Sequence, residues 1–436
     1  MAQEKKKMSV IQLTIITAIN MMGSGIIMLP TNLAQVGTMS ILSWVVTAGG
    51  AMCLAYAFSR AGMYTRNSGG MGGYAEYSYG KAGSFMANYT YGVSLVIANA
   101  AIAISAVGYF VVLFHLHFTP VEVALATIFT LWLATVMNFG GARITGQIST
   151  FTVWGVIIPV VVISLAGWFF FSGHMYATSW NPHNLGFFDG ISKSISITLW
   201  AFLGLESASA NMDSVENPKK NVPIAVLGGT IGAAIMYIVS TNVMQGIVPN
   251  STLAHSNAPF GVAFSQMFTP AIGNVVMGLM ILSCFGSLLG WQFTIAEVFR
   301  SSAHEGYFPK VFGKTIANGT PVAGMVIITI LQSLLALMTI SPSLSKQFTV
   351  LVNLAVVTNV IPYLLSMGAL KTMQLDAKVT ASARRTTNIV ATVASIYSLY
   401  ALYAVGATEL AYGALVTFAG WTLYGFVSNK YDLKKA

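Results

Sequence analysis

Long apolar stretches alternate with short polar connections along almost the whole chain. A helix needs about 20 mostly apolar residues to cross the roughly 30 Å hydrocarbon layer of a bilayer, and each stretch is close to that length. The pattern predicts an all-α polytopic membrane protein with twelve transmembrane helices and no inserted soluble domain. The predicted spans are residues 10–34, 39–60, 84–113, 121–138, 148–171, 192–211, 223–248, 272–299, 321–340, 347–370, 387–406 and 410–428.

Composition agrees with a membrane protein. Of the 436 residues, 55% are hydrophobic and 8% are charged, and the mean hydropathy is +0.72. A soluble domain has about 25% charged residues. The net charge of +9 would suit a nucleic-acid partner only if the basic residues shared one accessible face. They are spread over the short connections instead, so we expect no nucleic-acid partner.

The basic residues also predict the orientation of the chain, because loops rich in Lys and Arg stay cytoplasmic. With the amino terminus inside, the twelve spans place all of the 21 Lys and Arg residues except Lys193 and Lys346 in cytoplasmic segments. A missed or additional helix would move many of these basic residues to the outer side of the membrane. Both termini are therefore predicted to be cytoplasmic. The first apolar run is too long for a cleaved signal peptide and is interpreted as the first span.

The stretch 198–209, TLWAFLGLESAS, places the carboxylate of Glu206 inside a predicted span. A charge at the centre of a membrane helix costs about 2.5 to 3.5 kcal/mol on insertion scales, so it persists where the protein uses it. Glu206 is therefore the first candidate for a binding residue. It is the only carboxylate in the middle of a predicted span, which makes it the candidate proton carrier as well.

The first predicted span contains Gly23, Ser24 and Gly25 near its middle. Glycine weakens a helix by about 1 kcal/mol relative to alanine, and an unwound segment in a bilayer is tolerated where it lines a cavity. Taken alone, the three small residues are explained better by close helix packing. A second expected interruption, near residues 204–207 of span six, changes that interpretation.

Interrupted helices at matching positions of two inverted repeats indicate a transporter site. Spans one and six are the first helices of two five-helix units, about 10–171 and 192–370, followed by two extra helices over about 387–428. Free backbone N–H groups at an interruption suit a carboxylate, whereas Glu206 suits a cation. The pair predicts a site for an amino acid or an amine within one transmembrane domain that covers residues 1–436.

Other chemistry finds little support. Cys53 and Cys284 both fall in predicted spans and form neither a disulfide framework nor a metal site. The run from Gly313 to Thr315 resembles the end of a phosphate-binding loop, but Phe308 stands where that loop requires glycine. We therefore expect no enzyme activity, no cofactor and no metal, and we expect transport to be driven by solute gradients.

Four stretches carry a resemblance to a known family. They are NMMGSGIIMLP from Asn20, SGGMGGYAEYSYG from Ser68, WAFLGLES from Trp200 with SVENPKKNVP after it, and GWQFTIAEVFRSSAHEGYFPK from Gly290. From about residue 8 to the end, the chain resembles the basic amino acid and polyamine antiporters of the amino acid, polyamine and organocation superfamily.

The resemblance implies a LeuT-like fold with two inverted five-helix repeats, two extra helices, broken helices one and six, and often a dimer in the bacterial inner membrane. It implies that backbone groups of Gly23, Ser24 and Gly25 bind the substrate's carboxylate and amino group. Trp200 and Trp291 correspond to aromatic lids, and Glu206 corresponds to the carboxylate that binds the cation. Asn99 corresponds to a polar contact, and Tyr91 and Tyr363 correspond to gate residues.

The expected activity is exchange of an extracellular cationic amino acid such as ornithine for its cytosolic decarboxylation product, putrescine. The resemblance further implies uptake of putrescine with protons, so the expected partners are these solutes, protons and membrane lipids. Within the class, histidine with histamine or lysine with cadaverine are alternative pairs. From other classes, an amine permease without obligatory exchange and a membrane sensor stay open, although a sensor should carry a soluble output domain.

Overall fold

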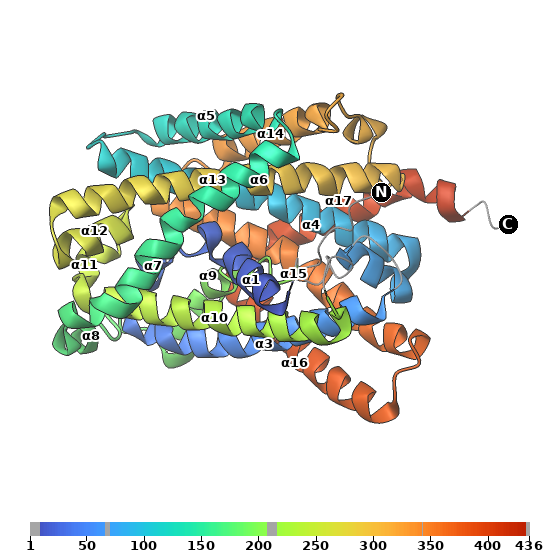
Figure 1. The fold of residues 1–436 in the computed structure, drawn as a ribbon, viewed down its shortest axis with the longest axis horizontal. Coiled ribbons are helices and arrows are strands. Elements are labelled where there is room, and N and C mark those ends of the chain that lie inside the picture. Colours follow the sequence, from blue (N-terminus) through green and yellow to red (C-terminus); the bar gives the residue numbers. More distant parts are fainter. Residues whose placement is uncertain (1–8, 66–69, 207–215, 342, 433–436) are drawn as a thin grey trace.

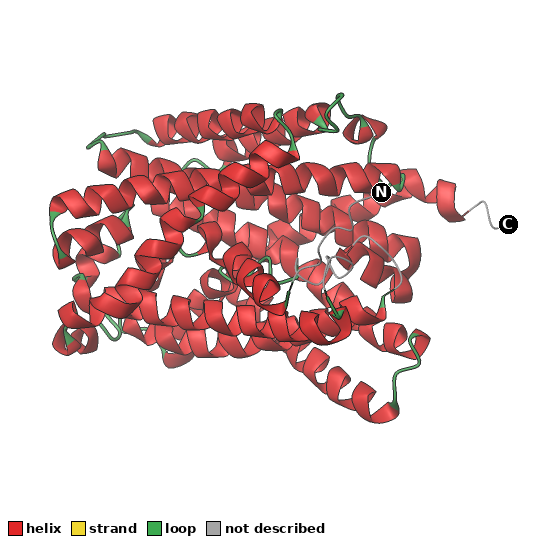
Figure 2. Ribbon diagram, viewed as in Figure 1, coloured by secondary structure: helices red, strands yellow, loops and turns green. Residues whose placement is uncertain are grey.

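The computed structural model describes residues 9–65, 70–206, 216–341 and 343–432, and within these ranges every regular element is helical (Figure 2). The longest helices run side by side along the long axis of the molecule (Figure 1). The α-helices are α1 (Val10–Gly25), α2 (Leu29–Ala34), α3 (Ile41–Tyr64), α4 (Gly70–Leu113), α5 (Pro120–Asn138), α6 (Ala142–Thr152), α7 (Trp154–Ala166), α8 (Gly173–Thr178), α9 (Phe187–Trp200), α10 (Pro218–Ile247), α11 (Asn250–Leu253), α12 (Pro259–Met267), α13 (Pro270–His304), α14 (Val322–Met338), α15 (Leu344–Asp376), α16 (Ala381–Val405) and α17 (Ala407–Asp432).

Among the described residues, nine helical segments are long and apolar enough to cross a membrane. They coincide with nine of the predicted spans. The other three predicted spans fall on α1 with α2, on α9 and on α14, which are shorter helices. The all-helical, multi-span architecture is therefore confirmed, and the count of twelve stays a prediction.

The helix α4 lies at the centre of the bundle and packs along α13 and α15. In its most apolar stretch 83% of the residues are buried, compared with 17% in α17. The peripheral helices expose large apolar side chains such as Phe129 on α5 and Phe418 and Phe426 on α17. Exposed apolar rings suit contact with lipid tails.

The chain turns between α1 and α2 at residues 26–28, and its backbone polar groups there are met by side chains. The hydroxyl of Tyr109 on α4 donates to the carbonyl of Ile27 at 3.2 Å and accepts from the backbone N–H of Phe260 at 3.3 Å. Buried backbone groups that leave a helix need such partners in a low-dielectric interior. Tyr109 therefore stabilises the turn by linking it to the start of α12.

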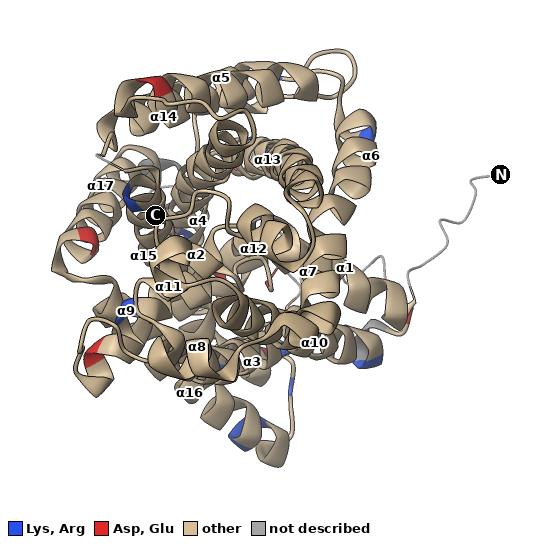
Figure 3. Cartoon of the chain, turned by 90° about the vertical axis from the view of Figure 1, so that its left-hand side faces the viewer, with Lys and Arg blue, Asp and Glu red and all other residues tan. Residues whose placement is uncertain are grey.

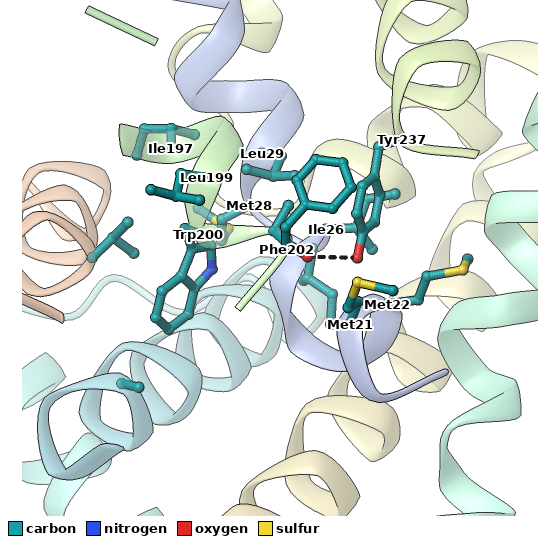
Figure 4. Packing of buried hydrophobic residues seen from close by; sticks show 14 of the residues in the cluster. Met21, Met22, Ile26, Met28, Leu29, Ile197, Leu199, Trp200, Phe202 and Tyr237 are labelled. Atoms are coloured by element: carbon teal, nitrogen blue, oxygen red, sulfur yellow. Dashed lines mark hydrogen bonds between the residues drawn. The ribbon is translucent and has the colours of Figure 1, made fainter. Parts of the chain in front are cut away.

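The chain leaves helical geometry a second time after α9, at residues 201–206. The hydroxyl of Tyr237 on α10 donates to the carbonyl of Ala201 at 2.9 Å, drawn as a dashed line in Figure 4. The Tyr237 ring stacks on Trp44, with ring centroids 5.6 Å apart, and meets Phe202 edge-on at 5.5 Å. This aromatic cluster fixes the turn. The continuation of span six past residue 206, including Ser207 at the end of the expected interruption 204–207, lies outside the described residues.

We expect Tyr237→Phe to lower the free energy of unfolding by about 1 to 3 kcal/mol, because the buried carbonyl of Ala201 loses its hydrogen-bond donor. Thermal unfolding of the purified protein in detergent measures the change. Tyr403→Phe is the matched control, since Tyr403 is 77% exposed on α16. Equal stability of the two variants would contradict this role of Tyr237.

The glycine-rich stretch before span three is helical from Gly70 onward, although the predicted spans leave it in the connection 61–83. The helix α4 begins at Gly70, and one residue inside it, Gly80, has non-helical angles with φ of +60°. Glycine adopts this angle without a steric penalty, so the chain bends at Gly80 and the helix continues on both sides. The helix before the bend is held to α15 by the hydroxyls of Ser78 and Thr372, 2.7 Å apart.

Few basic residues appear at the end of the molecule that carries α8, α11 and α12 (Figure 3). None of these three helices contains Lys or Arg. The sequence predicts that this end faces outward, and the distribution of charge suits that orientation.

Candidate functional site

A small cavity lies where α1, α4, α9, α13 and α15 meet. Its volume of about 40 Å³ is room for a few water molecules. The wall combines apolar side chains, two indole rings, a carboxylate and several amide and hydroxyl groups. The lining residues are Asn20, Met21, Gly25, Ser94, Leu95, Ala98, Ile102, Trp200, Leu203, Gly204, Glu206, Trp291 and Asn359.

Glu206 is the acidic side chain at this cavity, and it is 6% exposed. Three donors hold its carboxylate. The hydroxyl of Tyr91 donates to Oε1 at 3.1 Å, the hydroxyl of Tyr363 donates to Oε2 at 2.6 Å, and the backbone N–H of Gly204 donates to Oε2 at 3.1 Å. Since these donors are neutral, the carboxylate is fixed in position with its charge available to a cationic ligand.

The backbone at Gly204 makes this arrangement possible. Its φ of +103° lies in the region that favours glycine, and it directs the Gly204 N–H back to the carboxylate two residues later. A Cβ at this position would lie 3.4 Å from the carbonyl oxygen of Asn20 and 3.5 Å from the Trp291 ring. The turn after α9 is therefore packed between α1 and α13.

The end of α1 lies against the start of the second non-helical segment. A Cβ built on Gly25, at the end of α1, would lie 3.4 Å from the Cα of Ala201 at the end of α9. Gly25 and the segment 201–206, which contains Glu206, thus border the same cavity. Unwound backbone beside a buried carboxylate can bind an anionic and a cationic group at once.

Two tryptophans form much of the aromatic wall. Trp200 is 5% exposed and meets Phe348 edge-on, with ring centroids 6.5 Å apart. Its ring points to the opposite side of the chain from Phe202 (Figure 4). Trp291 faces the cavity from α13. A cation over an indole face gains about 0.5 to 2 kcal/mol, so both rings suit an ammonium group.

Most of the side chains predicted for the site do meet at this cavity. Gly25, Trp200, Glu206 and Trp291 line it, and Tyr91 and Tyr363 bind the Glu206 carboxylate from α4 and α15. Their roles toward a substrate stay predictions.

Three predicted residues lie elsewhere or are not described at this level. A Cβ on Gly23 would lie 3.0 Å from the hydroxyl of Ser287, so Gly23 permits close packing of α1 on α13. The side chain of Ser24 lies outside the described part of the chain. Asn99 donates to the amide oxygen of Gln292 at 2.6 Å, within a buried network that continues to Thr135, Thr329 and Gln332. A substrate contact of Asn99 also stays a prediction.

Sequence reasoning missed Asn20, Ser94 and Asn359, which all line the cavity. Helical spacing offered a signal for two of them. Asn359 lies four residues before Tyr363 and Ser94 lies three residues after Tyr91, so each shares a helical face with a tyrosine already chosen.

Two other acidic residues bind basic neighbours away from the cavity. Glu297 accepts from Arg300 Nε at 3.0 Å, and Glu76 pairs with Lys81 at 2.7 Å. Among the residues that the structure describes, no group of three His, Cys, Asp or Glu side chains is placed to hold a metal ion.

The fold and this site are those of a membrane transport protein with a small polar substrate. Residues 8–427 match the family model described as amino acid permease, and the chain belongs to that family. It is 67% identical over 435 residues to the putrescine transporter PotE of Haemophilus influenzae, with 100% of both chains covered. It is 65% identical to the putrescine transporter PotE of Escherichia coli K12, which covers 100% of this chain and 99% of the relative. A cadaverine/lysine antiporter of Escherichia coli K12 is 35% identical over 366 residues, 83% of this chain and 82% of the relative.

Proposed function

We propose that the chain is a secondary transporter of the bacterial inner membrane that exchanges extracellular ornithine for cytosolic putrescine. The observation that carries this proposal is the buried Glu206 carboxylate, held by three neutral donors at a cavity with two indole rings. Relatives that are about two thirds identical over the full length are named putrescine transporters, which supports the diamine as substrate.

The chemistry of the site fits both solutes. An ammonium group binds Glu206, and the methylene chain packs on Trp200 and Trp291. The α-carboxylate and α-amino group of ornithine bind backbone groups of Gly23, Ser24 and Gly25 in the last turn of α1, next to the turn at residues 26–28. Putrescine lacks the carboxylate and uses the remaining contacts. One site that binds either solute, opened alternately to each side, gives exchange.

The finer architecture is part of the same proposal. It comprises twelve spans, inverted repeats over about 10–171 and 192–370, extra helices over about 387–428, and interrupted helices one and six, with Glu206 in the interruption of helix six. Both termini face the cytoplasm, as the basic residues predict. Glu206 also serves as proton carrier during proton-coupled putrescine uptake, and the protein assembles as a homodimer in the lipid bilayer.

The runner-up within the class is exchange of lysine for cadaverine, because a relative that is 35% identical is named a cadaverine/lysine antiporter. One methylene in a pocket changes affinity by about 1 to 3 kcal/mol, so these pairs differ by modest changes of the wall. Exchange of histidine for histamine is the third pair. An amine permease and a membrane sensor are the alternatives from other classes.

A counterflow assay in proteoliposomes separates these functions. Vesicles are loaded with labelled putrescine, and ornithine, lysine, histidine, arginine or buffer is added outside. We expect rapid efflux with external ornithine and slow efflux with buffer. Equal efflux into buffer indicates a permease, no flux with any solute indicates a sensor, and a preference for lysine or histidine indicates another exchange pair.

A further inference from the structure

Asn359 on α15 carries a buried hydrogen-bond acceptor that the contacts above do not use. The side chain is 1% exposed and lines the central cavity. Its Nδ2 donates to the hydroxyl oxygen of Ser94 at 3.1 Å, and the Ser94 hydroxyl donates to the carbonyl of Ala355 at 2.9 Å. Because the Ser94 hydrogen is used by Ala355, the Ser94 oxygen accepts from Asn359, and this fixes the orientation of the amide.

The orientation leaves the amide oxygen of Asn359 unsatisfied. Oδ1 is buried and has no hydrogen-bond partner among the described residues. A buried acceptor without a donor costs about 1 to 3 kcal/mol, so such groups in folded proteins meet a water, an ion or a ligand. At the wall of a cavity, a ligand with an N–H donor satisfies it.

The position of Asn359 relative to Glu206 suggests which group of a ligand donates this hydrogen bond. Asn359 lies four residues before Tyr363, whose hydroxyl binds Glu206 at 2.6 Å. Four residues of α-helix span about 6 Å along the axis, so Asn359 and the tyrosine that binds Glu206 share one face of α15, about one turn apart, and both acceptors line the same cavity. Leu95, Ala98 and Ile102 on α4 add apolar surface to the same cavity.

We propose that Asn359 Oδ1 binds the second ammonium group of a short α,ω-diamine whose first ammonium binds Glu206. The inference rests on the proposed function and names the group that binds the second ammonium group of the substrate. A neutral amide suits exchange, because the corresponding end of ornithine carries a carboxylate next to its amino group. An acidic side chain there would repel that carboxylate, whereas the oxygen of a neutral amide accepts a hydrogen bond both from the ammonium group of the diamine and from the α-amino group of ornithine.

The test compares putrescine with 1-aminobutane, which has the same carbon chain and one amino group. Dissociation constants are measured from ligand-induced thermal stabilisation of the purified full chain. We expect the wild type to bind putrescine about 10- to 100-fold more tightly than 1-aminobutane, as a charge-assisted hydrogen bond implies. Asn359→Leu should remove this preference by weakening putrescine binding alone.

Several outcomes would overturn the proposal. They are a wild type without the preference, unchanged putrescine binding by Asn359→Leu, and an equal loss for both amines, which indicates a structural role. Ser94→Ala removes the anchor of the amide and keeps Oδ1, so it should weaken putrescine binding less than Asn359→Leu does. A wild type that binds neither putrescine nor ornithine contradicts the proposed function instead.

Asn359→Asp keeps the shape of the side chain and provides a second test if the leucine variant does not fold. We expect this variant to favour putrescine over ornithine by about tenfold more than the wild type does, because the added negative charge repels the carboxylate of ornithine. An unchanged ratio of the two affinities would overturn the proposal.

Discussion

Replacing Glu206 by glutamine is expected to reduce putrescine transport by about 100-fold or more. The substitution keeps the shape of the side chain and removes its negative charge. It also turns an amide NH₂ toward one of the donors that now bind the carboxylate, from Tyr91 on one side or from Tyr363 and the Gly204 N–H on the other. Removing one partner of a buried ion pair costs about 3 to 5 kcal/mol, which corresponds to this loss.

The measurement is putrescine–ornithine exchange in proteoliposomes at matched protein density. The control is Glu122→Gln, since Glu122 is an exposed acidic residue at the start of α5 and glutamine can keep its capping contact with Thr119. The control should transport normally. Normal exchange by Glu206→Gln would remove this carboxylate from the binding site and with it the basis of the proposed function.

The second large effect is expected for Gly204→Ala. Space alone admits the methyl group, because its nearest neighbours lie at 3.4 to 3.6 Å. The φ of +103° does not suit a residue with a Cβ, and the strain is about 1 to 3 kcal/mol. The chain relieves that strain by rotating the peptide, which takes the Gly204 N–H away from Glu206 and shifts the turn against Trp291. We expect exchange to fall at least about tenfold.

Gly278→Ala is the matched control. Gly278 lies inside α13 with no atom near its added Cβ, and alanine there favours the helix by about 1 kcal/mol. Exchange and thermal unfolding are measured for both variants. Equal exchange rates of Gly204→Ala and Gly278→Ala would contradict this prediction. They would show that transport needs neither the positive φ at residue 204 nor the hydrogen bond from its N–H to the Glu206 carboxylate.

The long helices could be predicted from the sequence, because the length and apolarity of each segment depend on neighbouring residues alone. Length and apolarity along the chain are enough to place long helices, and the nine segments found correspond to predicted spans. The predicted spans leave out the start of α4, because the four glycines before Gly80 disfavour a helix, whereas packing of Ser78 against α15 holds it as one. Local propensity is a weak guide where tertiary contacts decide.

The amino-acid sequence by itself determined that this chain enters a membrane many times and that one acidic residue must be used there, because burial in hydrocarbon penalises every charge independently of the fold. Only the tertiary structure decided what surrounds that residue. Tyr91 and Tyr363 bind Glu206 although they are 115 and 157 residues away from it in the sequence. Asn99 and Asn359 are both buried amides, but of the two only Asn359 lines the cavity. The rotation of each helix about its axis sets which face meets the cavity, and that rotation results from packing against all neighbouring helices at once.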